Sequence, residues 1–223
     1  MKSESLGASY LKKSPLDRVM ISKSGLAIEL SKLEVFKEPK VKLEQYPTDS
    51  EVAADLLWNA YLLGDIEDRN IADMGCGTGI LGVGALLLGA KHVTFIDKDE
   101  GALETTRKNL DTHGLKDHSI LRSDIDDIDG RFGTGVQNPP FGIKQRNADR
   151  PFLIKAFSLA DTIFSLHSAK SETFLEKISA DEGFIITHRF RYKFPLKRTQ
   201  RYHKKDLQRV DVIGIRAVKD RLH

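Results

Sequence analysis

Cysteine is nearly absent from the 223-residue sequence, which contains only Cys76. One cysteine excludes an internal disulfide framework and a multi-cysteine zinc site supplied by this chain alone, so we expect a reducing, cytoplasmic location and no metal. Long apolar runs are also missing, since no stretch reaches the roughly 18 residues of a membrane-spanning helix. The N-terminus lacks the apolar core of a secretory signal. Internal repeats, low-complexity tracts and flexible linkers are not found either, which favours one domain.

Charge is unevenly distributed, although the formal net charge is only +3. Residues 188–223 contain twelve Lys or Arg against three Asp or Glu, which leaves −6 on residues 1–187. Aromatic residues are interleaved with these cations: Phe190, Tyr192, Phe194 and Tyr202. Such a segment can neutralise phosphates and stack on bases. The alternative is a solvated edge strand and loop; we favour contact with nucleic acid.

The hydrophobic pattern predicts alternating strands and helices from residue 48 onward. Strands are expected at 70–74, 93–97, 119–122, 135–137 and 183–187, and helices at 49–61, 80–88, 101–112, 151–166 and 173–179. Two further β runs, 190–194 and 210–218, suggest a final hairpin around a basic loop. Because alternation of strands and helices implies a parallel sheet, we expect an α/β, Rossmann-like, doubly wound and mostly parallel sheet with an antiparallel C-terminal strand.

The chain before the regular pattern is harder to assign. Leu26, Leu30 and Leu33 are spaced like a short amphipathic helix that Pro39 would end, and Thr48 or Asp49 would cap the next helix. We expect residues 1–25 to be a loose N-terminal arm, and residues 26–223 to form the single domain.

A glycine-rich loop, Asp73-Met74-Gly75-Cys76-Gly77-Thr78-Gly79, follows the first predicted strand. Glycines at 75, 77 and 79 let the backbone approach a nucleotide closely. Their spacing differs from the G-x-G-x-x-G of dinucleotide-binding domains. The preceding carboxylate of Asp73 suits a cationic α-amino group better than a phosphate. The loop therefore predicts S-adenosyl-L-methionine as cofactor, with Cys76 as a small residue buried beneath it.

Acidic residues also follow the second and third predicted strands. Asp97 lies 22 residues after Gly75, where a carboxylate can accept both ribose hydroxyls. Asp124, with the neighbouring Ile125, is expected to meet the adenine ring of the cofactor. Each aspartate alone fits a turn or a cap. Three in register after successive strands, with Asp73 as the first, favour a cofactor site.

The tetrapeptide Asn138-Pro139-Pro140-Phe141 follows the fourth predicted strand, at the edge where open α/β sheets bind ligands. An amino nitrogen on adenine or on a carboxamide is not basic, so it needs help to attack a sulfonium methyl group. The Asn138 side-chain oxygen and the Pro139 carbonyl can each accept one N–H and orient the lone pair. The prolines keep these acceptors rigid, and Phe141 can stack on a flipped-out base. A merely stiff turn is the alternative.

The glycine loop and the tetrapeptide resemble the amino-methyltransferase branch of the class I methyltransferases, and the chain after about Leu26 resembles the methyltransferase-like protein 5 family. The resemblance extends to segments at 43–48, 142–144, 149–153, 165–167, 192–194 and 203–205. Among these, Glu-Gln-Tyr-Pro-Thr at 44–48 and Ser-Leu-His at 165–167 are the most specific. The sequence departs from the family at Ser168, where Lys is common, and at 145–148, which lacks the usual glycine.

The resemblance implies N6-methylation of one adenosine in small-subunit ribosomal RNA. It implies cofactor contacts from Gln45, Tyr46 and Thr48 at the methionine end, and Asn138 is expected to touch the cofactor as well. The residues expected to contact RNA are Lys144, Lys197, Arg198, Arg201, Lys204 and Lys205. Eukaryotic members of the family work with a small zinc-binding activator protein, which the resemblance therefore adds as a candidate partner.

Two other functions compete with RNA methylation. Protein glutamine N5-methylation uses a related Asn-Pro-Pro-aromatic arrangement, but that branch usually has Tyr where this chain has Phe141, and an N-terminal helical domain. The second alternative is an RNA assembly factor that binds the cofactor without turnover. His167 is open between a core histidine and a residue of an RNA-contacting loop.

Overall fold

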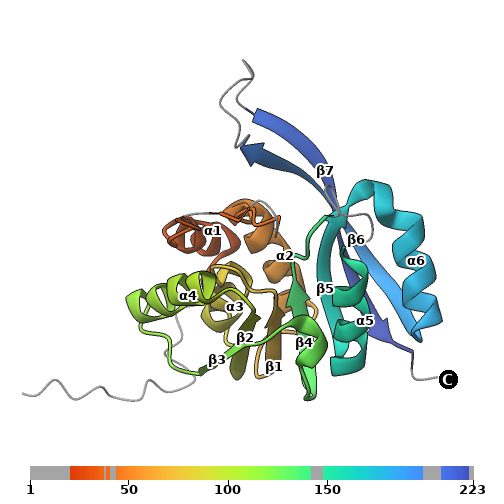
Figure 1. Ribbon diagram of the computed structural model, residues 1–223, viewed down its shortest axis with the longest axis horizontal. Helices are drawn as coiled ribbons and strands as arrows, with labels where there is room; N and C mark the ends of the chain where they lie inside the picture. Colours follow the sequence, from red (N-terminus) through yellow and green to blue (C-terminus); the bar gives the residue numbers. More distant parts are fainter. Residues whose placement is uncertain (1–20, 38, 41–43, 142–147, 198–206, 221–223) are drawn as a thin grey trace, which may run out of the picture.

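A computed structural model describes residues 21–37, 39–40, 44–141, 148–197 and 207–220, and for 195–197 and 207–209 only the backbone. One seven-stranded sheet forms its centre (Figure 1). The strands are β1 Asn70–Met74, β2 His92–Asp97, β3 His118–Arg122, β4 Phe132–Gln137, β5 Ala160–Ser168, β6 Phe184–Lys197 and β7 Leu207–Lys219. Their order is β3-β2-β1-β4-β5-β7-β6. The first five are parallel to one another, whereas β7 runs antiparallel to β5 and β6. The predicted fold class is confirmed.

Helices cover both faces of the sheet, as Figure 1 shows. One face carries α1 Lys23–Ser31, α2 Ser50–Leu62, α3 Ile80–Leu87 and α4 Glu100–Thr112; the other carries α5 Arg150–Leu159, α6 Glu172–Asp181 and the short 3-10 helix η3 Ile125–Asp127. Another 3-10 turn, η4 Ala169–Ser171, joins β5 to α6. Neighbouring residues of β5 divide between the two cores: Phe164 packs with the first group and Ile163 with the second. A strand buried on both faces lacks a polar side.

That burial explains the largest error of the sequence-based prediction. Residues 151–166 were expected to form one helix, but α5 ends at Leu159 and the chain continues as β5. The apolar residues of a doubly buried strand follow no two-residue alternation, so periodicity alone does not separate them from a buried helix. β5 lies between β4 and β7, and its ladders to both neighbours determine its conformation.

Two smaller predictions also needed correction. The first helix ends at Ser31 and does not reach Pro39. The strand runs predicted at 183–187 and 190–194 are one 14-residue strand, β6. Its register against β7 shifts between Ile186 and His188, and such a bulge bends a strand without ending it.

None of the helices in the described ranges is both long and apolar enough to cross a bilayer. Those same residues contain no cluster of His, Cys, Asp or Glu suited to a metal ion. The division into an arm at 1–25 and a domain at 26–223 stays a prediction, because most of the arm lies outside the described residues.

Candidate active site

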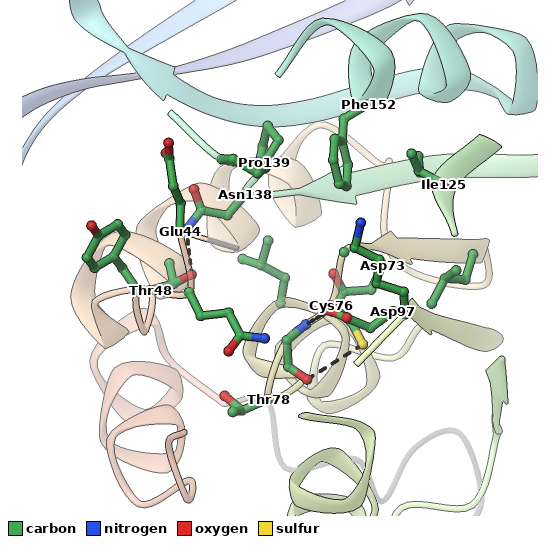
Figure 2. A pocket seen from close by; sticks show the side chains of 18 of the residues that line it. Glu44, Thr48, Asp73, Cys76, Thr78, Asp97, Ile125, Asn138, Pro139 and Phe152 are labelled. Carbon is green, nitrogen blue, oxygen red and sulfur yellow. Dashed lines mark hydrogen bonds between the residues drawn. The ribbon is translucent and has the colours of Figure 1, made fainter. Parts of the chain in front are cut away.

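A pocket of about 460 Å³ lies at the carboxyl ends of β1, β2, β3 and β4 (Figure 2). This volume falls within the roughly 300–1,000 Å³ range of small-molecule sites. The sequence-predicted residues that line it are Gln45, Tyr46, Thr48, Asp73, Gly75, Cys76, Gly77, Asp97, Asp124, Ile125, Asn138, Pro139 and Pro140. Gly79 and Phe141 are not among its lining residues. The topology therefore brings segments nearly 100 residues apart in the chain to one cavity.

The glycine loop requires its glycines for two reasons. Gly75 and Gly77 have backbone φ angles of 65° and 55°, which other residues rarely adopt. A Cβ at Gly75 would lie 2.8 Å from the ring of Phe152, and one at Gly77 would lie 2.8 Å from the ring of Phe36. Two aromatic rings thus pack directly on the loop. Sequence reasoning placed Phe36 in the first apolar run without a role at the loop, and it marked Phe152 only as part of a family resemblance.

Two carboxylates, the buried Asp73 and the half-buried Asp97, hold this loop. Asp73 is 1% exposed and its Oδ2 accepts the Gly82 N–H at 2.8 Å. Burial raises the pKa of Asp73 to about 7, with a smaller contribution from the nearby Asp97 carboxylate. Asp97 accepts the backbone N–H groups of Gly77 and Asp99, each at 2.9 Å, and burial raises its pKa as well. Both aspartates therefore stabilise the loop in addition to facing the pocket.

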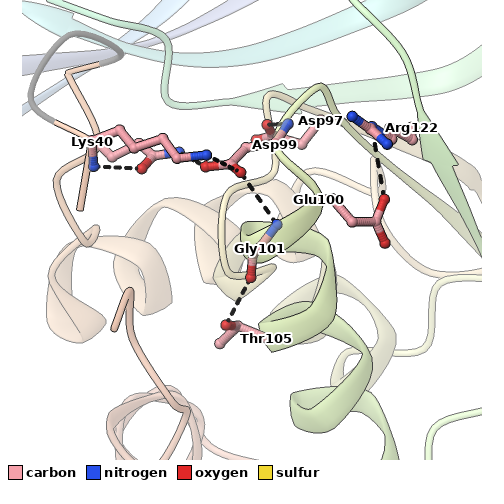
Figure 3. Close-up of polar contacts among 8 residues, drawn as sticks. Lys40, Asp97, Asp99, Glu100, Gly101, Thr105 and Arg122 are labelled. Atoms are coloured by element: carbon pink, nitrogen blue, oxygen red, sulfur yellow. Dashed lines mark hydrogen bonds and ion pairs between the residues drawn. The ribbon is translucent and has the colours of Figure 1, made fainter. Parts of the chain in front are cut away.

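Asp99 fastens the segment before α2 to the rim of the pocket, as Figure 3 shows. Its side chain is buried and accepts hydrogen bonds from Gln45 Nε2 at 2.7 Å and Lys40 Nζ at 2.6 Å. Burial would raise the pKa of Asp99, but the bonds from Lys40 and Gln45 outweigh it and lower the pKa. Because Gln45 Oε1 also accepts the Lys40 backbone N–H at 2.8 Å, both ends of its amide are engaged. Its cofactor contact stays a prediction.

The tetrapeptide places one amide in the pocket. Asn138 Nδ2 donates to Thr48 Oγ1 at 2.8 Å, whereas Asn138 Oδ1 is buried without a hydrogen-bond partner in the described part of the chain. Pro139 is buried beside it. Phe141 instead packs edge to face on Phe194, with ring centroids 6.2 Å apart. An unsatisfied buried acceptor at a ligand pocket indicates a site for an incoming donor.

A series of hydrogen-bonded, buried polar side chains begins at Gln137, directly before the tetrapeptide in the sequence. Gln137 Nε2 donates to Ser165 Oγ at 3.1 Å, Ser165 lies 2.6 Å from His167 Nε2, and His167 Nδ1 lies 2.9 Å from Asp149 Oδ2. His167 is 0% exposed, so it is a core histidine whose side chain is not accessible from the surface. Its hydrogen-bond partners are the side chains of Ser165 and Asp149. These hydrogen bonds connect the side chains of β4, β5 and the start of α5 next to the site.

Glu44 is a pocket residue to which the sequence assigned no role beyond its place in the family-specific segment. It is 8% exposed and has a φ of 48°, in a region that non-glycine residues seldom occupy. Its carboxylate lies at the Asn138 end of the cavity, away from Asp73 and Asp97 (Figure 2). Strained backbone of this kind is concentrated at functional sites.

The basic residues of β6 that the structure describes are paired within the chain. Arg189 and Arg191 both form ion pairs with Glu172 of α6, at 3.4 and 2.8 Å. Lys193 pairs with Asp211 of β7 at 3.1 Å. Exposed pairs of this kind contribute little to stability, but they neutralise part of the positive charge counted from the sequence.

The aromatic residues of β6 that follow the bulge lie on the other face of the strand. Phe190, Tyr192 and Phe194 pack against the first core group, and Tyr192 donates its hydroxyl to Asp55 at 3.0 Å. The described residues therefore do not combine the cations and rings into one surface. Of the predicted RNA contacts, Lys144, Arg198, Arg201, Lys204 and Lys205 lie outside the described residues, and the side chain of Lys197 is not described either.

Comparison with known proteins identifies similar chains over nearly the full length. Residues 48–159 match the family model described as methyltransferase small domain. The chain is 34% identical over 212 residues to a Methanocaldococcus jannaschii protein without an assigned function, covering 90% of this chain and 95% of that one. It is 32% identical over 194 residues to the Danio rerio rRNA N(6)-adenosine-methyltransferase METTL5, covering 84% and 94%.

A solved structure is similar in fold as well as in sequence. The crystal structure of a Pyrococcus horikoshii protein, described as a proposed RNA methyltransferase, has a TM-score of 0.84 and 43% sequence identity. The similarity covers 89% of this chain and 98% of that one.

Proposed function

Because the chain belongs to the methyltransferase small-domain family and, within it, to the methyltransferase-like protein 5 family, we propose that it methylates N6 of an adenosine in small-subunit ribosomal RNA. The observation that carries the proposal is the unpartnered Asn138 Oδ1 in the pocket, an acceptor for an amino N–H. The METTL5 relatives are named as rRNA N(6)-adenosine-methyltransferases, which supports adenosine over other amino groups. Ribosomal RNA, free or within the small subunit, is the proposed partner, and the cytoplasm the proposed location.

The residues of the pocket fit S-adenosyl-L-methionine. The loop has no Cβ at Gly75 or Gly77, Asp97 lies at the end of β2 where ribose hydroxyls would be bound, and Ile125 provides an apolar contact for a base. Asp73 lies at the end of β1 and can meet a cationic amino group. When bound, the cofactor supplies a methyl group that is activated by its sulfonium sulfur.

The protein's own contribution is orientation. Asn138 Oδ1 and the Pro139 carbonyl would each accept one N–H of the adenine amine, which turns the nitrogen lone pair out of conjugation with the ring. Because proline at 140 has no N–H, no backbone donor from that position competes for these acceptors. Holding the two reacting groups in line can contribute several kcal/mol, since effective molarities of oriented groups reach about 10⁵–10⁸ M.

Glutamine methylation is the second candidate, because a carboxamide nitrogen poses the same problem. Nucleoside mass spectrometry separates the two. Ribosomal RNA and ribosomal proteins are each analysed before and after incubation of unmodified small subunits with the protein and labelled cofactor. New N6-methyladenosine in the RNA is the expected result; label in protein only would overturn the proposal. Parallel reactions with and without a small zinc-binding activator protein test that predicted partner.

The pKa of Asp73 predicts how cofactor binding depends on pH. Below about pH 7 the carboxyl is mostly protonated and neutral, and above it the anion can pair with the cofactor's ammonium group. Cofactor affinity should therefore rise by up to about tenfold per pH unit as the pH increases towards 7, and then level off. Calorimetric titration of the cofactor between pH 5.5 and 8.5 measures this.

Asp73→Asn is the matched control, because the amide keeps the shape but does not titrate. It should bind the cofactor weakly, with a flatter pH profile. An equal pH profile in wild type and Asp73→Asn would argue against an ammonium contact at Asp73.

The predicted RNA contacts are tested by the dependence of RNA affinity on salt concentration. Replacing pairs among Lys197, Arg198, Arg201, Lys204 and Lys205 with Gln should reduce the slope of log K against log salt by close to 1 for each lost phosphate contact. Fluorescence anisotropy with a small-subunit RNA fragment measures the slope. As a control, Lys193→Gln removes a cation already paired with Asp211 and should change the slope less. Unchanged slopes in the paired variants would contradict an RNA role.

A further inference from the structure

The side-chain amide of Asn138 has a donor end and an acceptor end of almost the same shape, and only one of them suits the proposed reaction. A substrate amine offers N–H groups, so it needs the oxygen. With the amide rotated by 180°, Nδ2 would face the amine and two donors would meet. Something must therefore hold the amide in one of its two orientations.

Thr48 is the described residue that contacts the amide. Its Oγ1 accepts from Asn138 Nδ2 at 2.8 Å, although the two residues are 90 positions apart in the chain. This hydrogen bond uses Nδ2, the donor end of the amide, and Oδ1 has no hydrogen-bond partner in the described ranges. The orientation seen therefore leaves the acceptor end unpaired, as an incoming N–H donor requires.

Thr48 is itself well fixed. Asp49 caps α2 with bonds from the backbone N–H groups of Glu51 and Val52, at 3.0 and 3.2 Å. Because Asp49 serves as the cap, the hydroxyl of Thr48 is not used at the helix end and is directed to Asn138. The α2 helix behind it buries six residues in the first core, which makes the hydroxyl a rigid partner.

We propose that Thr48 is a positioning residue that selects the catalytic orientation of the Asn138 amide. The inference rests on the proposed function, since it concerns the acceptor of that reaction. A threonine hydroxyl can donate as well as accept. It therefore selects this orientation only while its own proton is donated to another acceptor, and the bound cofactor, which Thr48 is expected to contact in the pocket it lines, can take that proton. The role differs from a plain cofactor contact, because it acts on turnover even when the cofactor site is full.

Thr48→Val and Thr48→Ser separate the two roles. Valine keeps the shape and removes the hydroxyl, so kcat at saturating cofactor and RNA should fall by about tenfold or more, the effect expected of one hydrogen bond. Serine keeps the hydroxyl and should restore most of the rate. A Thr48→Val protein with wild-type kcat and only weaker cofactor binding would overturn the inference. Thr112→Val, on the exposed face of α4, is the matched control.

The substitution Asn138→Asp distinguishes a positioning role of Thr48 from a purely structural one. Both oxygens of a carboxylate are acceptors, so Asn138→Asp has no orientation left to select. Adding Thr48→Val to Asn138→Asp should lower kcat by less than threefold, whereas in the wild-type background it lowers kcat by about tenfold. Equal losses in both backgrounds would contradict the inference. If the wild-type protein does not methylate RNA, the proposed function is wrong. If it does methylate RNA but Thr48→Val lowers kcat equally in both backgrounds, only the inference about Thr48 is wrong.

Discussion

Asn138→Ala should lower kcat on the order of 100- to 1,000-fold, the usual loss when one preorganised hydrogen bond to a reacting group is removed. The substitution deletes Oδ1, the buried acceptor without a partner in the described residues. The Pro139 carbonyl alone would then hold the amine, and the nitrogen lone pair would be poorly aligned. Single-turnover methylation of small-subunit RNA at saturating cofactor measures the change.

Cofactor affinity in Asn138→Ala should fall far less than turnover, because Asp73, Asp97 and the glycine loop are untouched. This division separates an enzyme from the assembly-factor alternative. A cofactor-binding protein without turnover would function equally well with alanine at 138. Retained biological activity in Asn138→Ala would therefore favour that alternative. A loss of cofactor affinity as large as the loss of turnover would mean that Asn138 acts mainly on the cofactor and not on the amine that accepts the methyl group.

Asp97→Ala should have the opposite effect, weakening cofactor binding about 100-fold before it affects the chemical step. Two hydrogen bonds from ribose hydroxyls to a carboxylate are lost, and bonds to charged groups contribute about 1.5–3 kcal/mol each. The substitution also removes the acceptor of the Gly77 and Asp99 backbone N–H groups, so the loop is loosened. Equilibrium dialysis with labelled cofactor measures the affinity.

Asp97→Asn serves as the control, because the amide keeps one acceptor oxygen and should bind more tightly than the alanine variant. With saturating cofactor, Asp97→Asn should recover most of the wild-type kcat. If instead Asp97→Ala and Asn138→Ala lost cofactor affinity to the same degree, the assignment of one residue to the donor and the other to the acceptor would be wrong.

The sequence was sufficient for the parallel strands β1 to β4 and for about half of the residues that line the pocket. The strand at Asn70–Met74 was predicted at its observed bounds, because a short apolar run followed by spaced glycines has few other structural readings. Asp97 and Asp124 were found for the same reason, since residues after successive parallel strands meet at one edge. In an alternating pattern of strands and helices, the position directly after each strand can be read from the sequence.

Contacts between distant segments were not predictable in the same way. β5 was taken for a helix because its conformation depends on two neighbouring strands and not on its own pattern. The link from Asp149 through His167 to Ser165 was visible only as a family resemblance, with no indication that the three side chains would bond to one another. The same holds for Asn138 and Thr48, which no spacing rule relates.

The place of β7 in the sheet has a consequence for how the chain is assembled. β7 is synthesised after the other six strands of this sheet, yet it lies between β5 and β6 and pairs with β5 over residues 162–168. Until the ribosome has released residues 207–219, β5 has one unpaired edge, and exposed strand edges promote association between chains. Ser165 and His167 lie on that strand, so the support of Asn138 is completed only when the C-terminal hairpin closes. Long-range pairing of this kind slows folding, and a C-terminal truncation would leave an aggregation-prone chain with most of its cofactor loop already formed.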